Sequence, residues 1–140
     1  MREILSRSIE ETYNIGQDIA SRLQGGEVII LDGDLGAGKT VFAKGLAKGL
    51  DIDCIINSPT FTIMNVYQGR LKFCHFDMYR IDDEDELREL GFDEYIGHKD
   101  NVCAIEWASK TPSLISDDVI KVSIQKIDQD SRMIRVEGLE

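Results

Sequence analysis

The stretch from Gly33 to Thr40 constrains this chain more than any other part of its sequence. It reads Gly-Asp-Leu-Gly-Ala-Gly-Lys-Thr and matches the phosphate-binding pattern Gly-x-x-x-x-Gly-Lys-[Ser/Thr] at every fixed position. The apolar run Val28–Leu31 before it is typical of a buried parallel strand, and apolar residues recur at helical spacing after it. The order strand, glycine loop, helix predicts a nucleotide-binding loop, whereas a glycine-rich turn with no ligand is the alternative.

The residue types in this loop explain how it would bind phosphate. Glycines let the backbone curl so that its N–H groups point at phosphate oxygens, and the helix that begins near Lys39 adds the positive end of its dipole. We expect Lys39 to reach the β- and γ-phosphates and the Thr40 hydroxyl to ligate Mg²⁺.

The composition limits the class of protein. The length of 140 residues predicts a single domain, a P-loop ATPase domain spanning residues 1–140. The net charge of −10 means that the surface as a whole should repel nucleic acid. No apolar stretch is long enough to span a membrane and the N-terminus lacks the apolar core of a signal peptide, so we expect a cytoplasmic protein with no membrane partner. Cys74 and Cys103 lie in apolar runs, which predicts buried thiols.

The rest of the sequence predicts helices and strands in alternation, with two antiparallel hairpins. Ser8-x-x-Glu11 resembles a capping box and starts a helix that ends at Gly25-Gly26. The acidic run Asp82–Glu86 is expected to open a short helix, and Val102–Ile105 indicates a second buried strand. The hairpins are expected at 63–67 with 71–76 and at 119–124 with 133–136. The predicted fold is α/β: a single P-loop NTPase-like domain with a mixed, mostly parallel sheet flanked by helices and carrying antiparallel hairpins.

Three further segments carry side chains that suit a nucleotide site. Hydroxyls in Ser58–Thr62 could sense a γ-phosphate or magnesium, although a Ser/Thr-rich turn is the simpler alternative. Asp77 ends an apolar strand, where a second carboxylate near magnesium is expected, and His75 alternates with it; the alternatives are an Asp that starts a turn and a structural His. Glu106 follows a buried strand, where it could bind Mg²⁺ or orient water, or merely end the strand in solvent. Trp107 could cover the nucleotide or pack in a core.

In this order the segments resemble the TsaE (YjeE) family of bacterial ATPases. The resemblance covers nearly the whole chain and rests on the loop at 33–40, Ser-Pro-Thr-Phe-Thr at 58–62, His-Phe-Asp-Met-Tyr-Arg at 75–80, Glu-Leu…Leu-Gly at 86–91 and Glu-Trp at 106–107. It implies a cytosolic Mg-ATPase that acts with the TsaD and TsaB proteins in making the threonylcarbamoyladenosine modification of tRNA. The ATPase would support the modifying complex, and it would meet tRNA only through these partners.

The resemblance also implies roles for individual residues. The family's catalytic positions fall on Lys39, Asp77 and Glu106, and its magnesium ligands fall on Thr40 and Glu106. Contacts to ATP fall on Asp34, Leu35, Gly36, Ala37, Gly38, Lys39, Thr40, Val41, Thr60 of the switch-like segment and Trp107, with adenine contacts at Ile9 and Arg132. One departure is visible, because Ala108 stands where many members have Pro after Glu-Trp, which leaves that loop less constrained.

Other proteins with the same loop match this sequence less well. A P-loop kinase needs a basic lid with several Arg residues, and residues 71–131 include only Arg80 and Arg88. A GTPase needs an Asn-Lys-x-Asp motif, and the chain has none. A nucleotide-binding regulatory module without useful turnover stays open, and Glu106 is the feature against it.

The loop chemistry predicts the effect of removing the lysine charge. Lys39→Ala should weaken ATP binding by at least about 1.5–3 kcal/mol, the scale of a charge-assisted hydrogen bond. Calorimetric titration of the folded variant with ATP measures this loss. Unchanged affinity would show that Lys39 does not contact the phosphates, and equal wild-type affinity for GTP would contradict the choice of adenine.

Overall fold

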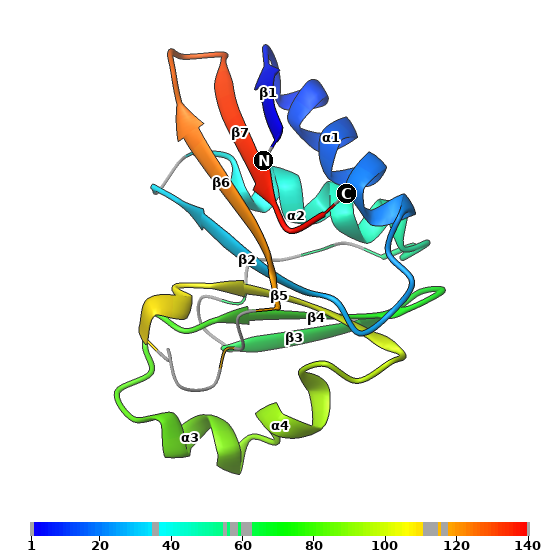
Figure 1. Cartoon of the computed structure of the whole chain (residues 1–140), viewed down its shortest axis with the longest axis vertical. Helices are drawn as coiled ribbons and strands as arrows, with labels where there is room; N and C mark the ends of the chain where they lie inside the picture. The colour runs from blue at the N-terminus through cyan, green and yellow to red at the C-terminus, as the bar shows by residue number, and fades with distance from the viewer. Residues whose placement is uncertain are drawn as a thin grey trace.

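A computed structural model describes residues 2–34, 37–54, 56, 59, 63–110, 115 and 118–139. Seven strands in these residues form one sheet with the spatial order β1-β7-β6-β2-β5-β4-β3, as Figure 1 shows. In chain order the elements are β1 (Arg2–Ser6), α1 (Ile9–Ser21), β2 (Val28–Gly33), α2 (Lys39–Gly49), β3 (Met64–Gln68), β4 (Lys72–Asp77), α3 (Glu84–Glu89), α4 (Phe92–Tyr95), β5 (Asn101–Glu106), the 3-10 helix η1 (Ala108–Lys110), β6 (Ile120–Lys126) and β7 (Arg132–Glu137).

The centre of the sheet is parallel and both margins are antiparallel. Strands β6, β2, β5 and β4 pair in parallel, whereas β3–β4, β6–β7 and β1–β7 are antiparallel pairs. The predicted mixed sheet and both predicted hairpins are therefore confirmed. The carboxyl ends of β2, β5 and β4 meet at one edge, and in open α/β sheets this is where ligands bind.

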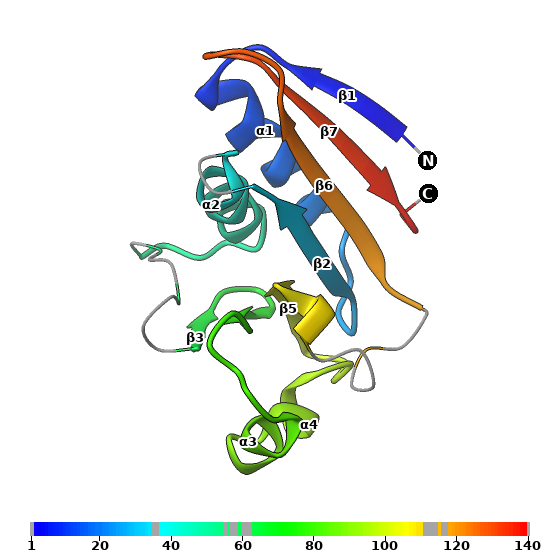
Figure 2. The same cartoon turned by 90° about the vertical axis from the view of Figure 1, so that its left-hand side faces the viewer.

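Helices cover the two faces of the sheet unequally. Helices α1 and α2 pack on one face, over a core that includes Phe42, Leu46 and Ile29 (Figure 2). Helices α3 and α4 pack on the other face, over Phe76 and Ile105 of β4 and β5. The buried Cys74 and Cys103 also lie on this second face, as their apolar surroundings predict.

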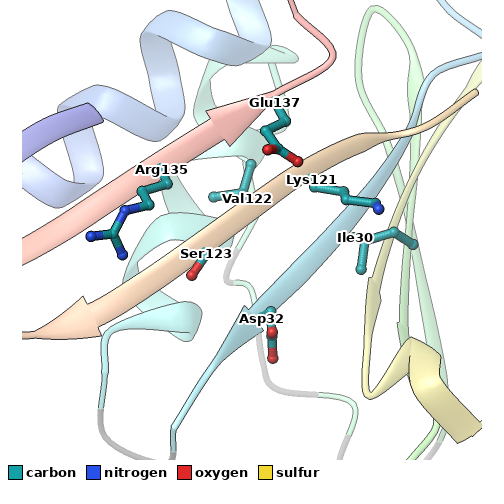
Figure 3. Close-up of a pocket in the computed structure, with 7 residues that line it drawn as sticks. All are labelled: Ile30, Asp32, Lys121, Val122, Ser123, Arg135 and Glu137. Atoms are coloured by element: carbon teal, nitrogen blue, oxygen red, sulfur yellow. The ribbon is translucent and has the colours of Figure 1, made fainter. Parts of the chain in front are cut away.

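The half of the second face formed by β2, β6 and β7 carries charged and polar side chains, and the apolar residues Ile30 and Val122 also contribute to it. Figure 3 shows a pocket of about 240 Å³ there, and its lining includes Asp32, Lys121, Ser123, Arg135 and Glu137. Charges of both signs alternate with the buried residues of the same strands, so this surface suits contact with water. Among the described residues, none of those expected to contact phosphate lines this pocket.

Local sequence signals account for most of the helices. Ser8 caps α1 by accepting a hydrogen bond from the Glu11 backbone N–H at 3.1 Å, as the capping box predicts. Asp83 caps α3 in the same way, through the Asp85 backbone N–H. The sequence pattern does not predict β1, whose pairing partner β7 lies at the other end of the chain, or α4, which has four residues. Within the described residues, no helix combines the length and the apolar character needed to cross a membrane.

Glycines let α1 and α2 approach closely. A Cβ added at Gly45 would lie 2.1 Å from the Tyr13 carbonyl oxygen of α1, and one added at Gly49 would lie 2.5 Å from the Gln17 carbonyl oxygen. Side chains at these positions would separate the helices, because backbone atoms cannot yield as a flexible side chain can. The position of α2 against α1, and hence of its N-terminus at the site, depends on this contact.

This close contact predicts that Gly45→Ala destabilises the fold. The added methyl overpacks the contact, and we expect the free energy of unfolding to fall by about 1–3 kcal/mol, although alanine favours a helix by roughly 1 kcal/mol over glycine. Urea unfolding measures the change. Lys44→Ala, at the adjacent exposed position, is the matched control and should stay within about 0.5 kcal/mol of wild type. A Gly45→Ala variant as stable as wild type would contradict the packing argument.

Candidate functional site

The glycine loop joins β2 to α2, as the sequence predicts. Gly33 ends β2, and Gly38 caps α2 with a φ of 107°, a left-handed conformation that glycine adopts without strain. Gly38 provides no side-chain cap, and α2 has no acidic residue in its first turn. The first N–H groups of α2 and the positive end of its dipole can therefore receive an anion. Leu35 and Gly36 lie outside the described residues.

The loop lysine meets the carboxylate at the end of β5. The Lys39 Nζ lies 3.4 Å from the Glu106 Oε1, and both side chains are largely buried. Glu106 is the last residue of β5, which pairs in parallel with β2 and brings this carboxylate to the start of α2. Two residues that are 67 positions apart in the sequence thus form an ion pair beside the loop.

His75 is the second partner of Glu106. The His75 Nε2 lies 2.7 Å from the Glu106 Oε2, and His75 is only 1% exposed. Burial by itself raises the pKa of the Glu106 carboxyl, but the hydrogen bond with His75 and the charge of Lys39 outweigh it, so the pKa lies below its ordinary value. Glu106 is accordingly ionised at neutral pH and can accept a proton or bind a cation.

Asp77 lies beside Glu106 on the neighbouring strand. The two residues are register partners in the parallel pair β4–β5, and both are buried. The Asp77 Oδ1 also accepts a hydrogen bond from the Tyr79 backbone N–H at 3.0 Å. The hydrogen bond to Tyr79 confirms that Asp77 starts a turn, and its place beside Glu106 leaves the magnesium role as a prediction.

An aromatic pair borders the ion pair. The Trp107 ring lies 5.5 Å from the Lys39 Nζ, within reach of a cation–π interaction, and its centroid is 5.0 Å from that of Tyr79. Trp107 has a φ of 59° and is 46% exposed, so it lies outside the core. Sequence reasoning did not assign Tyr79 to the site, although its place two residues after Asp77 is the signal that could have found it.

The C-terminal hairpin contacts the glycine loop through Arg132. The Arg132 Nε donates a hydrogen bond to the Ala37 carbonyl oxygen at 2.9 Å, and its Nη1 donates to the Asp128 carbonyl oxygen at 2.9 Å. Ile9 is 74% exposed at the first turn of α1. The structure thus brings Arg132 to the loop and leaves Ile9 on the surface of α1.

The residues proposed to hold Mg²⁺ do not supply a full set of metal ligands by themselves. Thr40 is exposed in the first turn of α2, Val41 next to it is half-buried, and Asp34 is exposed at the second position of the loop. Within the described residues, no three His, Cys, Asp or Glu side chains gather into a metal site. Mg²⁺ commonly takes one or two carboxylates and completes its shell with phosphate and water, so an ionised Glu106 with Thr40 fits this mode of binding. Ser58 and Thr60–Thr62 lie outside the described residues.

Comparisons with known proteins show the family of the chain. A family model described as "Threonylcarbamoyl adenosine biosynthesis protein TsaE" matches residues 6–134. The chain is 42% identical to the tRNA threonylcarbamoyladenosine biosynthesis protein TsaE of Bacillus subtilis, over 96% of this chain and 85% of that protein. It is 38% identical to the TsaE protein of Treponema pallidum, over 94% of this chain and 97% of that protein.

The chain belongs to the TsaE family. The crystal structure of YdiB from Bacillus subtilis has the same fold, with a TM-score of 0.84 and 34% identity over 99% of this chain and 86% of that chain. The family is named for a part in tRNA threonylcarbamoyladenosine biosynthesis. The resemblance drawn from the sequence motifs is therefore confirmed at the level of the family.

The position of Trp107 in the TsaE-family fold predicts an optical signal. Trp107 is the chain's only tryptophan, and its ring lies next to Lys39, so its emission should change when Mg-ATP is added. Fluorescence titration measures this change in emission. In Lys39→Ala the same change should require a far higher concentration of nucleotide. A flat titration in wild type, with binding confirmed by calorimetry, would show that Trp107 does not report on the nucleotide.

Proposed function

We propose that the chain is a Mg-dependent ATPase that acts in the cytoplasm, with the TsaD and TsaB proteins, in the threonylcarbamoyladenosine modification of tRNA. Membership of the TsaE family supports the pathway. The strand–loop–helix unit with Lys39 at its helix start supports nucleotide binding. Glu106 supports hydrolysis rather than binding alone.

The observation that carries the proposal is the ion pair between Lys39 and Glu106 at 3.4 Å. In the absence of nucleotide each charge compensates the other in a largely buried place. Triphosphate oxygens would give the Lys39 ammonium a more highly charged partner, and its movement toward them would release the Glu106 Oε1. Glu106 would then be an ionised, oriented acceptor beside the phosphates, where it could take a proton from the attacking water.

The groups around Lys39 and Glu106 suit the binding of phosphate and Mg²⁺. The N–H groups at the start of α2 would hold phosphate oxygens, and Arg132 would keep the loop in place through the Ala37 carbonyl. Thr40 and one of the carboxylates Glu106 and Asp77 would hold Mg²⁺. When bound, the metal would neutralise charge on the phosphate oxygens.

Charge and surface chemistry support the part given to partners. The net charge of −10 disfavours direct binding to tRNA, so a partner should hold the tRNA. Tyr79 and Trp107 are both about half exposed at the mouth of the site, where a docking protein could exclude water. The isolated chain is then expected to hydrolyse ATP slowly and to gain activity when its partners dock.

Replacing the carboxylate tests the proposal. Glu106→Gln should keep ATP binding and lower phosphate release by roughly 100-fold or more, the lower end of what a general base contributes. Phosphate release is measured with and without TsaD and TsaB, together with repeated rounds of tRNA modification. Glu137→Gln, at the end of β7 opposite Arg132, is the matched control and should keep wild-type turnover.

Three outcomes would contradict parts of the proposal. Wild-type turnover in Glu106→Gln would leave Asp77 as the candidate base. Nucleotide binding without turnover in wild type, even with both partners, would favour a regulatory module. Tight binding of tRNA by the purified chain at physiological salt would contradict the charge argument.

A further inference from the structure

His75 is a buried polar side chain beside Glu106 to which the proposed function gives no role. It lies in β4, it is 1% exposed, and its ring stacks on that of Phe73 with centroids 5.7 Å apart. Its Nε2 contacts the Glu106 Oε2 at 2.7 Å, while its Nδ1 has no hydrogen-bond partner among the described residues. Burying a polar ring with one unpaired nitrogen is costly, and an apolar side chain would pack against Phe73 without that cost.

The surroundings of the ring place a hydrogen on Nε2. The Glu106 carboxylate can only accept, so the His75 Nε2 must carry the hydrogen and donate it. The 2.7 Å separation therefore places an Nε2–H between the His75 ring and the Oε2 of Glu106.

This hydrogen bond gives the two carboxylate oxygens of Glu106 different partners. Oε2 is held by His75, and Oε1 faces the Lys39 Nζ at 3.4 Å. A carboxylate fixed at one oxygen cannot rotate freely about its last torsion, so the direction of the other oxygen is set as well. His75 itself is held by the strand pairing of β4 with β5 and by the Phe73 ring.

We propose that His75 is a positioning residue: its Nε2–H holds the Oε2 of Glu106 and aims Oε1 at the phosphate site. This inference rests on the proposed function of Glu106. The contribution of His75 is orientation, since a displacement of about 1 Å in a reacting group can lower a rate by roughly 100-fold. His75 touches neither substrate nor metal in this account.

The hydrogen on Nε2 is tested on the free protein by ¹⁵N NMR. The chain has only two histidines, so a spectrum of labelled protein that correlates ring nitrogens with ring hydrogens needs only His98→Asn to assign both. We expect the His75 Nε2 to give the signal of a nitrogen that carries a hydrogen. A hydrogen found on Nδ1 and not on Nε2 would overturn the inference without involving ATP.

Two isosteric variants test the positioning. In His75→Gln the side-chain amide nitrogen lies near the place of Nε2, whereas in His75→Asn it lies near that of Nδ1 and cannot reach Glu106. We expect His75→Asn to lower kcat by roughly 10- to 100-fold with KM for ATP within about twofold, and His75→Gln to recover most of that loss. His98→Asn, at an exposed histidine, is the matched control and should leave both constants unchanged. Equal kcat in all four proteins would overturn the inference.

A double-variant cycle separates this inference from the proposed function. If His75 acts through Glu106, His75→Asn should cost nothing further in the Glu106→Gln background. If His75→Asn lowers kcat by the full factor in the Glu106→Gln background as well, His75 acts independently of Glu106. That result would overturn the inference about His75 and leave the proposed function standing. Wild-type turnover in Glu106→Gln overturns the proposed role of Glu106 itself. If circular dichroism shows that His75→Asn does not fold, the NMR result and His75→Gln still test the inference. The inference requires His75→Gln to keep most of the wild-type kcat.

Discussion

The parallel pairing of β5 between β2 and β4 is the constraint on which the site depends. It ends three strands at the same edge of the sheet, so the glycine loop after β2, Asp77 of β4 and Glu106 of β5 become neighbours. The register Asp77–Glu106 puts two carboxylates on one face, where like charges would repel unless cations and donors compensated them. Lys39 and His75 supply that compensation for Glu106, and the Tyr79 backbone N–H supplies part of it for Asp77.

Elements at both ends of the chain hold the loop in place. Helix α1 fixes α2 through the close contact at Gly45, and Arg132 of β7 binds the Ala37 carbonyl of the loop. Strand β1 pairs with β7, so the hairpin that carries Arg132 does not form the exposed edge of the sheet. Contacts from both ends of the chain therefore hold the glycine loop, and an anion site that aims donors at its ligand needs such support.

Much of the fold followed from local chemistry. The loop at Gly33–Thr40, the cap at Ser8, the acidic helix start at Asp82–Glu86 and the two hairpins are short-range signals, and the structure has each of them. Strand β1 was missed because its pairing with β7 joins opposite ends of the chain, and no local pattern encodes such a contact. Helix α4 was missed because four residues after a glycine are too few to show a helical period.

By itself the sequence determined the phosphate loop, the carboxylate at the end of β5 and membership of the TsaE family, because each depends on residue types at fixed spacings. Only the tertiary structure decided how these parts meet. It paired Lys39 with Glu106, gave His75 its place on Oε2 and set Trp107 beside the lysine with about half of its surface in solvent. These contacts join separate strands, and their geometry depends on sheet register and side-chain burial, which no single stretch of sequence contains.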